Sequence, residues 1–526
     1  MAISDLTFDL GLTSVPVTTI LLTIVIIFLM WISVSAFSVL SHTNLPGPTP
    51  WPFVGSFFAL HGGPQYHINI TNLIKKYGEI FCCYEGRKPT IVVADPDMLK
   101  QILVKEFHKF QNRHHALGSP KRTNPVFGQS VLFLEDRRWK EVRTILTPAF
   151  SAAKMKEMSP FINAATSQLL NALESHKVKG DSFNLWKVFG NYTLDVIAAA
   201  AFGIDIETQK DLNNQFIQKS TQIVGSFLFK SVRFFVTSVF PFLIPPTAAL
   251  VMKQRKPMFQ FFEDIMDELL DSRQIHGSER RDFCQLLLEA AEQTSSGKEI
   301  ANGFSSKSMQ KTKLTRIEMK AQIMVFLLAA FDTTTNTLAY CCYLLARHPE
   351  IQERLIQEVD DALKGETNLD YNSVQKLPYM EMVISETQRL YPAAFRVNRK
   401  CLESCTINGV HFPKGIQVDI PIYGIHHNPQ FWPDPEKFDP ERFTPEAKAV
   451  RNPYTFLPFS HGPRNCIGMR FAQLEMKIAL SRVLQKYKFT TSPKTEVPLK
   501  LEVGITMTPT NGIHLKVIDR DEKVPV

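Results

Sequence analysis

The sequence predicts a mainly α-helical protein with small β-sheets, preceded by one N-terminal transmembrane helix. Three observations lead to this prediction. Residues 17–40 carry no charged side chain and are rich in Ile, Leu, Val and Phe. From about residue 95 onward, helical patterns dominate over short strand patterns. A long stretch that is apolar nearly all round, within residues 315–347, indicates a helix that passes through the middle of the fold.

The segment 17–40 is long enough to span a bilayer with some tilt. Asp5 and Asp9 precede it without any Lys or Arg, whereas a cleaved signal peptide has a basic start and a shorter apolar core. We therefore expect a short tail (residues 1–16) and an uncleaved single-span anchor (17–40). The nearest basic pair, Lys75 and Lys76, favours a cytoplasmic location for the C-terminal side.

A proline-rich hinge is expected at residues 41–52, where prolines at every second position exclude a helix and give a stiff connector. The rest, residues 53–526, is predicted to be one large body with a sizeable core, since 44% of the chain is hydrophobic. The net charge of +8 is compatible with an anionic membrane or an acidic partner, and no basic run with aromatics suggests nucleic acid. Among the eight cysteines no CxxC pair occurs, which argues against a zinc site.

Short strands are predicted at residues 80–83 and 90–93, around a turn at Gly86. An apolar, Phe-rich patch at 227–244 is either core or a surface that enters the membrane, and the polar segment 294–313 is an expected exposed loop. The expected helices before the central one cover residues 96–104, 139–146, 160–175, 185–202, 253–271 and 285–292.

The central helix, 315–347, opens with the capping-box pattern of Thr315 and Glu318. A second helix is expected at 379–390, after Pro378 and before Pro392. The pair Asn408-Gly409 predicts a β-hairpin, because both residues suit a type I′ turn.

Cys466 lies at the end of Phe-Ser-His-Gly-Pro-Arg-Asn-Cys-Ile-Gly (residues 459–468), immediately before a predicted helix. Gly462 and Pro463 predict a tight turn. Backbone N–H groups at the helix start, together with Arg464, favour a thiolate. Such a cysteine is a nucleophile, a redox centre or a metal ligand, and the surrounding residues argue against a merely buried thiol.

Four other groups have structural as well as functional interpretations. Asp332 and Thr333 interrupt the apolar central helix and form either a kink or a hydrogen-bonding site. The spacing of Glu386 and Arg389 is most often a surface pair, which Arg442 joins if its loop folds back. Trp139 and Arg143 form a packing or cation–π pair. Arg137, Arg138 and Lys140 are by default a solvated helix face.

Together these residues resemble the cytochrome P-450 superfamily. Its haem-binding signature Phe-x-x-Gly-x-Arg-x-Cys-x-Gly is matched at every fixed position between Phe459 and Gly468, and the other motifs follow in the family's order. The resemblance covers essentially the whole chain. It is closest to the microsomal animal branch that contains the vertebrate family 3 drug and steroid monooxygenases and thromboxane synthase.

The resemblance implies a cytochrome P-450 fold with Cys466 as the thiolate ligand of haem b iron and Phe459 beside it. Arg464, Arg113, Arg399, Trp139 and Arg143 match positions that hold the haem propionates. Glu386, Arg389 and Arg442 match a structural lock, and Asp332 with Thr333 matches a proton relay. The family usually has Gly where this chain has Ala330. Substrate contacts are expected by family position at Phe331, Ala329, Ala394, Phe395, Gly504 and Ile505.

The implied function is a monooxygenase that inserts one atom of O2 into a steroid, fatty acid or xenobiotic, with electrons from NADPH. NADPH–cytochrome P-450 reductase is the expected partner and cytochrome b5 a second candidate, with Arg137, Arg138 and Lys140 as candidate contacts. The expected location is the endoplasmic reticulum membrane, with the catalytic domain in the cytoplasm. The alternatives are a haem-thiolate isomerase or lyase acting on lipid peroxides, and a non-catalytic haem- or lipid-binding protein.

Overall fold

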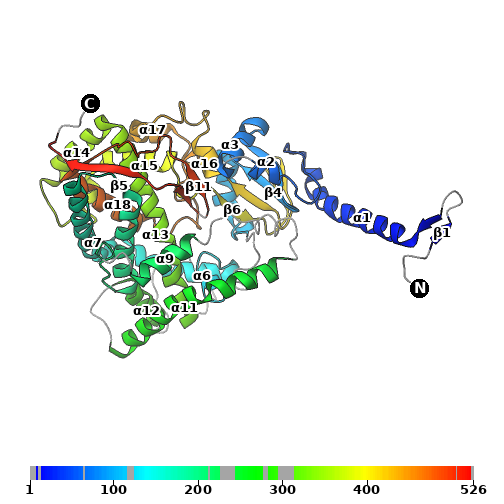
Figure 1. Ribbon diagram of the computed structural model, residues 1–526, viewed down its shortest axis with the longest axis horizontal. Coiled ribbons are helices and arrows are strands. Elements are labelled where there is room, and N and C mark those ends of the chain that lie inside the picture. The colour runs from blue at the N-terminus through cyan, green and yellow to red at the C-terminus, as the bar shows by residue number, and fades with distance from the viewer. Residues whose placement is uncertain are drawn as a thin grey trace.

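Helix α13 (Arg316–Arg347) forms the centre of the body, as its apolar sequence predicts (Figure 1). It contacts α8 (Leu185–Ile197), α15 (Pro378–Leu390) and α18 (Met469–Leu484). The predicted capping box is present: the Thr315 hydroxyl oxygen accepts from the Glu318 N–H, and the Glu318 carboxylate accepts from the Thr315 N–H at 2.9 Å. Both of these backbone donors at the start of the helix are thereby satisfied.

The structure is a computed structural model that describes residues 7–9, 14–62, 65–114, 124–210, 214–225, 243–276, 282–293, 313–504 and 506–522. The predictions for the apolar patch at 227–244 and the loop at 294–313 therefore fall almost wholly outside the described residues. Seven further helices are α2 (Phe57–His61), α3 (Tyr66–Tyr77), α9 (Gln215–Gly225), α12 (Phe283–Gln293), α14 (Pro349–Leu363), α16 (Ile422–His426) and α17 (Pro445–Val450).

The largest sheet has four strands in the order β3 (Ile80–Glu85), β4 (Lys88–Val93), β9 (Gln417–Ile420) and β6 (Val397–Lys400). It lies between α1 and the helix-rich part of the body (Figure 1). The predicted hairpin is confirmed as β7 (Cys405–Ile407) and β8 (Val410–Phe412), with positive φ at both Asn408 and Gly409.

The other sheets are small and antiparallel. Strand β13 (His514–Asp519) pairs with both β10 (Tyr487–Thr490) and β5 (Phe183–Asn184). Strand β11 (Leu501–Val503) pairs with β12 (Met507–Pro509), and β1 (Thr7–Asp9) pairs with β2 (Ser14–Pro16) ahead of the anchor. The mainly α fold with small sheets is thus confirmed.

Several helices differ from the predicted bounds. Helix α7 (Ala152–Lys179) contains Pro160, which the sequence analysis took as its start, because Met155, Met158 and Ile162 bury the turns on both sides. Helix α11 (Ile244–His276) likewise continues across Pro257. Helix α6 (Asp136–Leu146) was also predicted. Two other predicted helices end in wider π-helical turns: α4 (Pro96–Lys100) is continued by Gln101–Lys105, and α8 is continued by Ala198–Phe202.

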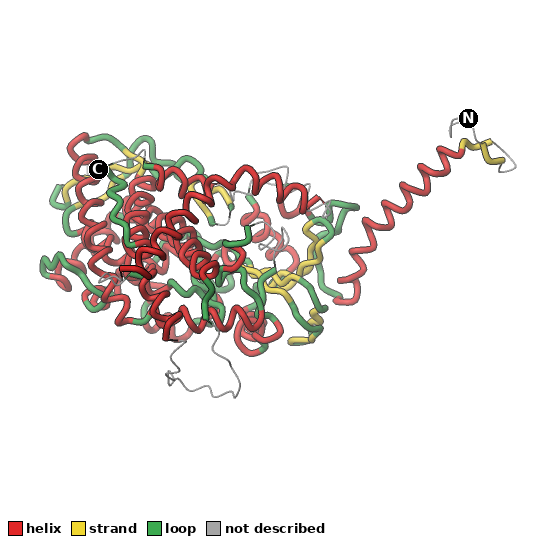
Figure 2. Tube along the Cα trace, turned by 90° about the horizontal axis from the view of Figure 1, so that it is seen from below, coloured by secondary structure: helices red, strands yellow, loops and turns green. Residues whose placement is uncertain are grey.

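The N-terminal apolar helix α1 (Val17–Ser35) extends away from the body and buries almost none of its surface (Figure 2). The 3₁₀ helix Ala36–Thr43 that follows it behaves differently. Leu40 is buried in the core around the four-stranded sheet, and the Tyr84 hydroxyl donates to the Phe37 carbonyl at 2.6 Å. Residues 36–40, assigned to the anchor by sequence, therefore pack against the body.

A truncation series tests where the anchor ends. A chain that starts at Ala36 should leave the membrane and unfold at nearly the full-length temperature. A chain that starts at His42 should lose roughly 2–5 kcal/mol of stability, because Leu40 no longer fills its site, and the Tyr84 hydroxyl loses its acceptor. Thermal unfolding of both chains, followed by circular dichroism, checks this. Equal midpoints would show that the 3₁₀ helix contributes nothing to the body.

Candidate cofactor site around Cys466

The loop that carries Cys466 is closed by its own backbone. The Cys466 N–H donates to the Phe459 carbonyl at 2.9 Å, and the Asn465 N–H donates to the Gly462 carbonyl at 3.1 Å. Gly462 has a φ of +80°, and a Cβ atom there would lie 1.9 Å from the Leu103 carbonyl oxygen. Glycine is therefore required at this position, both for the turn and for the close approach to the π-helical turn at Gln101–Lys105.

Burial of the Cys466 thiol raises its pKa, although the side chain keeps accessible surface. Two influences oppose the burial: the N–H groups of Gly468 and Met469 at the start of α18, and the guanidinium groups of Arg143 and Arg113. The sequence analysis expected a favoured thiolate, with Arg464 as the nearby charge. The free thiol instead has a raised pKa, and the guanidinium groups that act most on it are Arg143 and Arg113.

Arg113, Arg143, Arg399 and Arg464 form a cluster beside this thiol, within which the charges of neighbouring guanidinium groups act on one another. Burial and the neighbouring Arg113 lower the pKa of Arg399 to about 9. Burial and the other three guanidinium groups lower the pKa of Arg464 to about 8, opposed by the carboxylate of Glu135. The cluster therefore concentrates positive charge in a desolvated place.

Several donors of the cluster have no hydrogen-bond partner among the described residues. They are Nε of Arg113, Nε of Arg464, and both Nε and Nη2 of Arg399. The bonds that are made go to neutral oxygens: Arg399 donates to the Asn398 carbonyl at 2.9 Å, and Arg464 donates to the Gln111 carbonyl at 2.6 Å. Unused buried donors with a surplus of positive charge fit a ligand that carries carboxylates, as haem does.

Trp139 and Arg143 lie one helical turn apart on α6, and both meet the cysteine loop. The Arg464 guanidinium lies 4.9 Å from the centre of the Trp139 ring. Arg143 donates to Oδ1 of Asn465 at 2.9 Å. Phe459 is half-buried at the other end of the loop. The structure thus brings all the haem-holding residues expected by family position to one region, from segments that are far apart in sequence.

Asp332 is 3% exposed in the middle of α13, and burial raises its pKa to about 7. The Thr506 hydroxyl donates to its Oδ2, whereas Oδ1 has no partner among the described residues. The Thr333 hydroxyl donates to the Ala329 carbonyl at 2.7 Å, the back-bond that the sequence analysis considered. Thr506 was missed from the sequence, because no motif marks a single threonine 174 positions away in the chain.

The residues expected to touch substrate divide into two groups. Ala329 is exposed in the middle of the mostly buried α13, and Ala394 is half-buried. Phe331 and Phe395 are buried: Phe331 packs towards Gly190 of α8, and Phe395 packs edge-on against Tyr66. Gly504 is buried with its N–H donating to the Thr506 carbonyl at 2.9 Å, and Ile505 lies outside the described residues.

Glu386 and Arg389 are not a surface pair, since both side chains are fully buried. Arg389 donates to both carboxylate oxygens of Glu386, at 2.7 and 2.9 Å, and Arg442 lies 3.4 Å from the same carboxylate. The Asp439 N–H also donates to Glu386 at 3.0 Å. This buried triad therefore ties α15 to the segment around residues 439–442.

Of the three basic residues proposed to meet a partner, Arg138 is already engaged. Its Nε donates to Glu318 at 2.7 Å and its Nη1 to Glu141 at 2.9 Å, which joins α6 to the start of α13. Arg137 and Lys140 are exposed, Arg137 with an ion pair to Glu141 at 2.7 Å. Only these two present their charge to the surface.

The described residues contain no cluster of His, Cys, Asp and Glu side chains that could by itself hold a metal ion. A family model described as Cytochrome P450 matches residues 45–517. Thromboxane-A synthase of Rattus norvegicus is 36% identical over 529 residues, which cover 96% of this chain and 97% of that protein. Cytochrome P450 3A9 of the same organism and Cytochrome P450 3A12 of Canis lupus familiaris are also 36% identical, each over 96% of this chain and 97% of its own length.

Substitution of Arg399 tests whether the cluster is built for an anionic ligand. Arg399→Met should speed haem loss, because N–H donors without a protein partner are removed from the cluster. The change should not destabilise the haem-free protein, because that form loses only a poorly paired buried charge. The matched control is Arg396→Met, since Arg396 is paired with Glu85 at 2.9 Å and Asp419 at 3.2 Å. That change should cost about 3–5 kcal/mol in both forms.

Haem transfer to an acceptor protein and thermal unfolding with and without haem measure these effects. If the haem-free Arg399→Met protein unfolds at as low a temperature as the Arg396→Met protein, Arg399 is not an unpaired buried cation in the haem-free form.

Proposed function

The chain belongs to the cytochrome P450 family, and from this premise we propose that it is a membrane-anchored haem-thiolate monooxygenase that inserts one oxygen atom of O2 into an apolar substrate. Its homologues support a haem-thiolate enzyme. The observation that carries the choice of reaction is the environment of Asp332. A buried carboxyl with a pKa of about 7, hydrogen-bonded to a hydroxyl, suits proton delivery, which O2 activation requires.

In this proposal Cys466 is the iron ligand, and Arg113, Arg399 and Arg464 hold the two propionates, helped by Arg143 and Trp139. When bound, the haem supplies the oxygen chemistry, with thiolate ligation favouring O–O cleavage. The Phe459 carbonyl accepts a hydrogen bond from the Cys466 N–H, and this bond fixes the loop. Gly462 keeps the loop against Leu103, so that the sulfur is positioned before any ligand arrives.

Asp332 and Thr333 act as the proton relay, with Thr506 as a third member. The Thr506 hydroxyl holds Oδ2 of Asp332, which leaves Oδ1 to exchange a proton. The Thr333 hydroxyl donates a hydrogen bond to the Ala329 carbonyl, so its oxygen can accept a hydrogen bond from a neighbouring donor. On this part of α13, Ala329 is exposed and Thr333 is half-buried. A steroid, fatty acid or xenobiotic is the proposed class of substrate.

We further propose that electrons come from NADPH through NADPH–cytochrome P-450 reductase, with cytochrome b5 as a second donor, at the endoplasmic reticulum membrane. The exposed apolar span Val17–Ser41 supports membrane anchoring. Arg137 and Lys140 are the exposed cations on α6, the helix that also carries Trp139 and Arg143. They are the best candidates for an acidic partner surface, since Arg138 is committed to Glu318.

A second candidate function is an isomerase or lyase that rearranges lipid peroxides without O2 or reductase. Relatives named Thromboxane-A synthase match this chain as closely and as fully as the cytochrome P450 3A proteins do. A non-catalytic carrier with histidine ligation is disfavoured, because the neighbouring His461 ring hydrogen-bonds the Pro453 carbonyl at 3.1 Å and packs on Tyr454.

Turnover by the full-length protein, reconstituted with the reductase in lipid, separates these functions. A monooxygenase should consume NADPH and place one atom from ¹⁸O2 in the product. Mass spectrometry of products from a steroid, fatty acid and xenobiotic panel checks this. Rearrangement of a lipid peroxide in the absence of NADPH and O2, with no labelled product in their presence, would replace the proposal by the isomerase or lyase.

The pH dependence of coupling tests the relay. Asp332 donates only when protonated, so the fraction of NADPH electrons recovered in product should fall as pH rises through about 7. Asp332→Asn should lower this fraction and remove its pH dependence. Thr506→Val should shift the fall to higher pH, because a hydroxyl that donates to the carboxylate favours its charged form. Thr508→Val, two residues along on β12, is the control.

Product and hydrogen peroxide are measured together from pH 6 to 9. A wild-type profile that stays flat across this range, or an Asp332→Asn profile that retains the fall, would show that Asp332 is not the titrating donor.

A further inference from the structure

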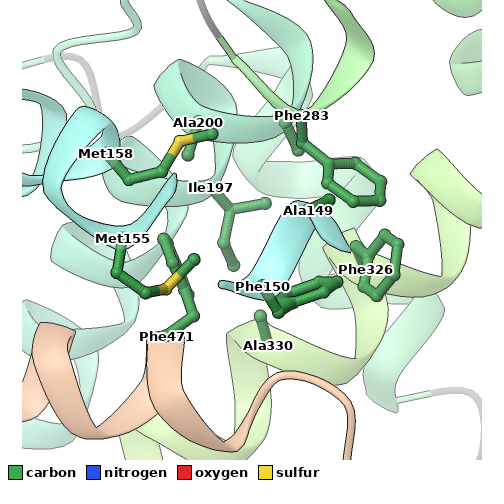
Figure 3. A pocket seen from close by; sticks show the side chains of 11 residues that line it. Ala149, Phe150, Met155, Met158, Ile197, Ala200, Phe283, Phe326, Ala330 and Phe471 are labelled. Carbon is green, nitrogen blue, oxygen red and sulfur yellow. The ribbon is translucent and has the colours of Figure 1, made fainter. Parts of the chain in front are cut away.

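We propose that an apolar cavity beside α13 holds one molecule of dioxygen. The cavity has a volume of about 50 Å³ and is lined by carbon and sulfur side chains alone, among them Ala200, Ala330 and Phe471 (Figure 3). Every lining residue is buried or half-buried, and the cavity is partly open at its edge. This proposal rests on the proposed oxygen chemistry, because it assigns a place to that reaction's gaseous substrate.

The walls come from several elements that pack around one point. Met155 and Met158 enter from α7, and Ala200 enters from the π-helical turn that ends α8 (Figure 3). Phe150, Phe283 and Phe326 close one side as a ring cluster, with centres 4.2–5.7 Å apart. Their mutual contacts hold the wall in place, so the space between them is a fixed feature of the packing.

The chemistry of the lining selects the occupant. A water molecule needs two to four polar partners, and these walls offer none, so the cavity should stay dry. Engineered apolar cavities of roughly 150 Å³ bind benzene or xenon. A space about a third as large excludes a ring but accepts a diatomic gas. Dioxygen is apolar and gains by leaving water for such a site.

The position of the cavity connects it to the proposed reaction. Phe326 and Ala330 lie one turn apart on the same face of α13, and Thr333 of the proposed relay follows Ala330 by three residues on the same side of the helix. Phe471 is in the first turns of α18, five residues after Cys466. The cavity therefore touches both helices that frame the cofactor site. A gas molecule held there waits beside the segment that delivers protons.

Rebinding of carbon monoxide after photodissociation tests the cavity in the full-length holoenzyme, because carbon monoxide is a diatomic gas of nearly the same size. In wild type, part of the released gas should return from inside the protein, and xenon under pressure should remove most of that part by filling the cavity. Ala200→Val should remove it without xenon, since the added methyl groups occupy the space. Ala164→Val, at an exposed position of α7, should leave it unchanged.

These readouts require a haem but no turnover, so they are independent of the ¹⁸O2 experiment. The xenon measurement uses the wild-type protein, so it tests whether the cavity holds the released gas even if Ala200→Val folds poorly. The proposal is overturned if xenon leaves the internal fraction unchanged, or if Ala164→Val removes it as fully as Ala200→Val does.

Discussion

Positive charge is concentrated around Cys466 in a desolvated part of the protein. Four guanidinium groups lie near one thiol, several of their donors are unused among the described residues, and the carboxylate of Glu135 opposes the charge on Arg464. Such an arrangement is costly unless an anion completes it. The unused donors of the cluster therefore fit a cofactor that carries carboxylates. The contrast with Arg396, which has two carboxylate partners, shows that the chain pairs its buried arginines elsewhere.

Helix α13 connects this cofactor site to the remaining functions. Its first turn is fixed by the capping box and by Arg138, which joins it to α6. Its middle carries Asp332, held by Thr506 from the C-terminal sheet region. One face there is accessible at Ala329 and another borders the apolar cavity at Ala330. Proton delivery, substrate contact and gas storage are thus proposed for neighbouring faces of one helix. The rigidity of the helix keeps these three sites at fixed positions relative to one another.

The relatives explain why the family is established while the reaction remains a proposal. Proteins named as thromboxane synthase and as cytochrome P450 3A members match the chain with the same identity and coverage. The thiolate and the arginines proposed to hold the propionates would serve either kind of enzyme, so those residues do not distinguish them. The distinction lies in whether protons are delivered. The titratable Asp332, poised near neutral pH in a desolvated site, therefore has more weight in the choice than the signature around Cys466.

The family, the anchor helix, the central helix with its cap and the loop of Cys466 were all predictable from the amino-acid sequence, because each depends on local patterns. Periodicity, capping residues and a glycine with positive φ act within a few residues of one another. Only the tertiary structure decided that Arg138 is tied to Glu318, that Phe331 packs towards α8, that Thr506 reaches Asp332, and that α7 continues through Pro160. It also reversed the direction expected for the thiol's pKa. Burial and long-range contacts set these features, and neither is written in the residues next to them in the chain.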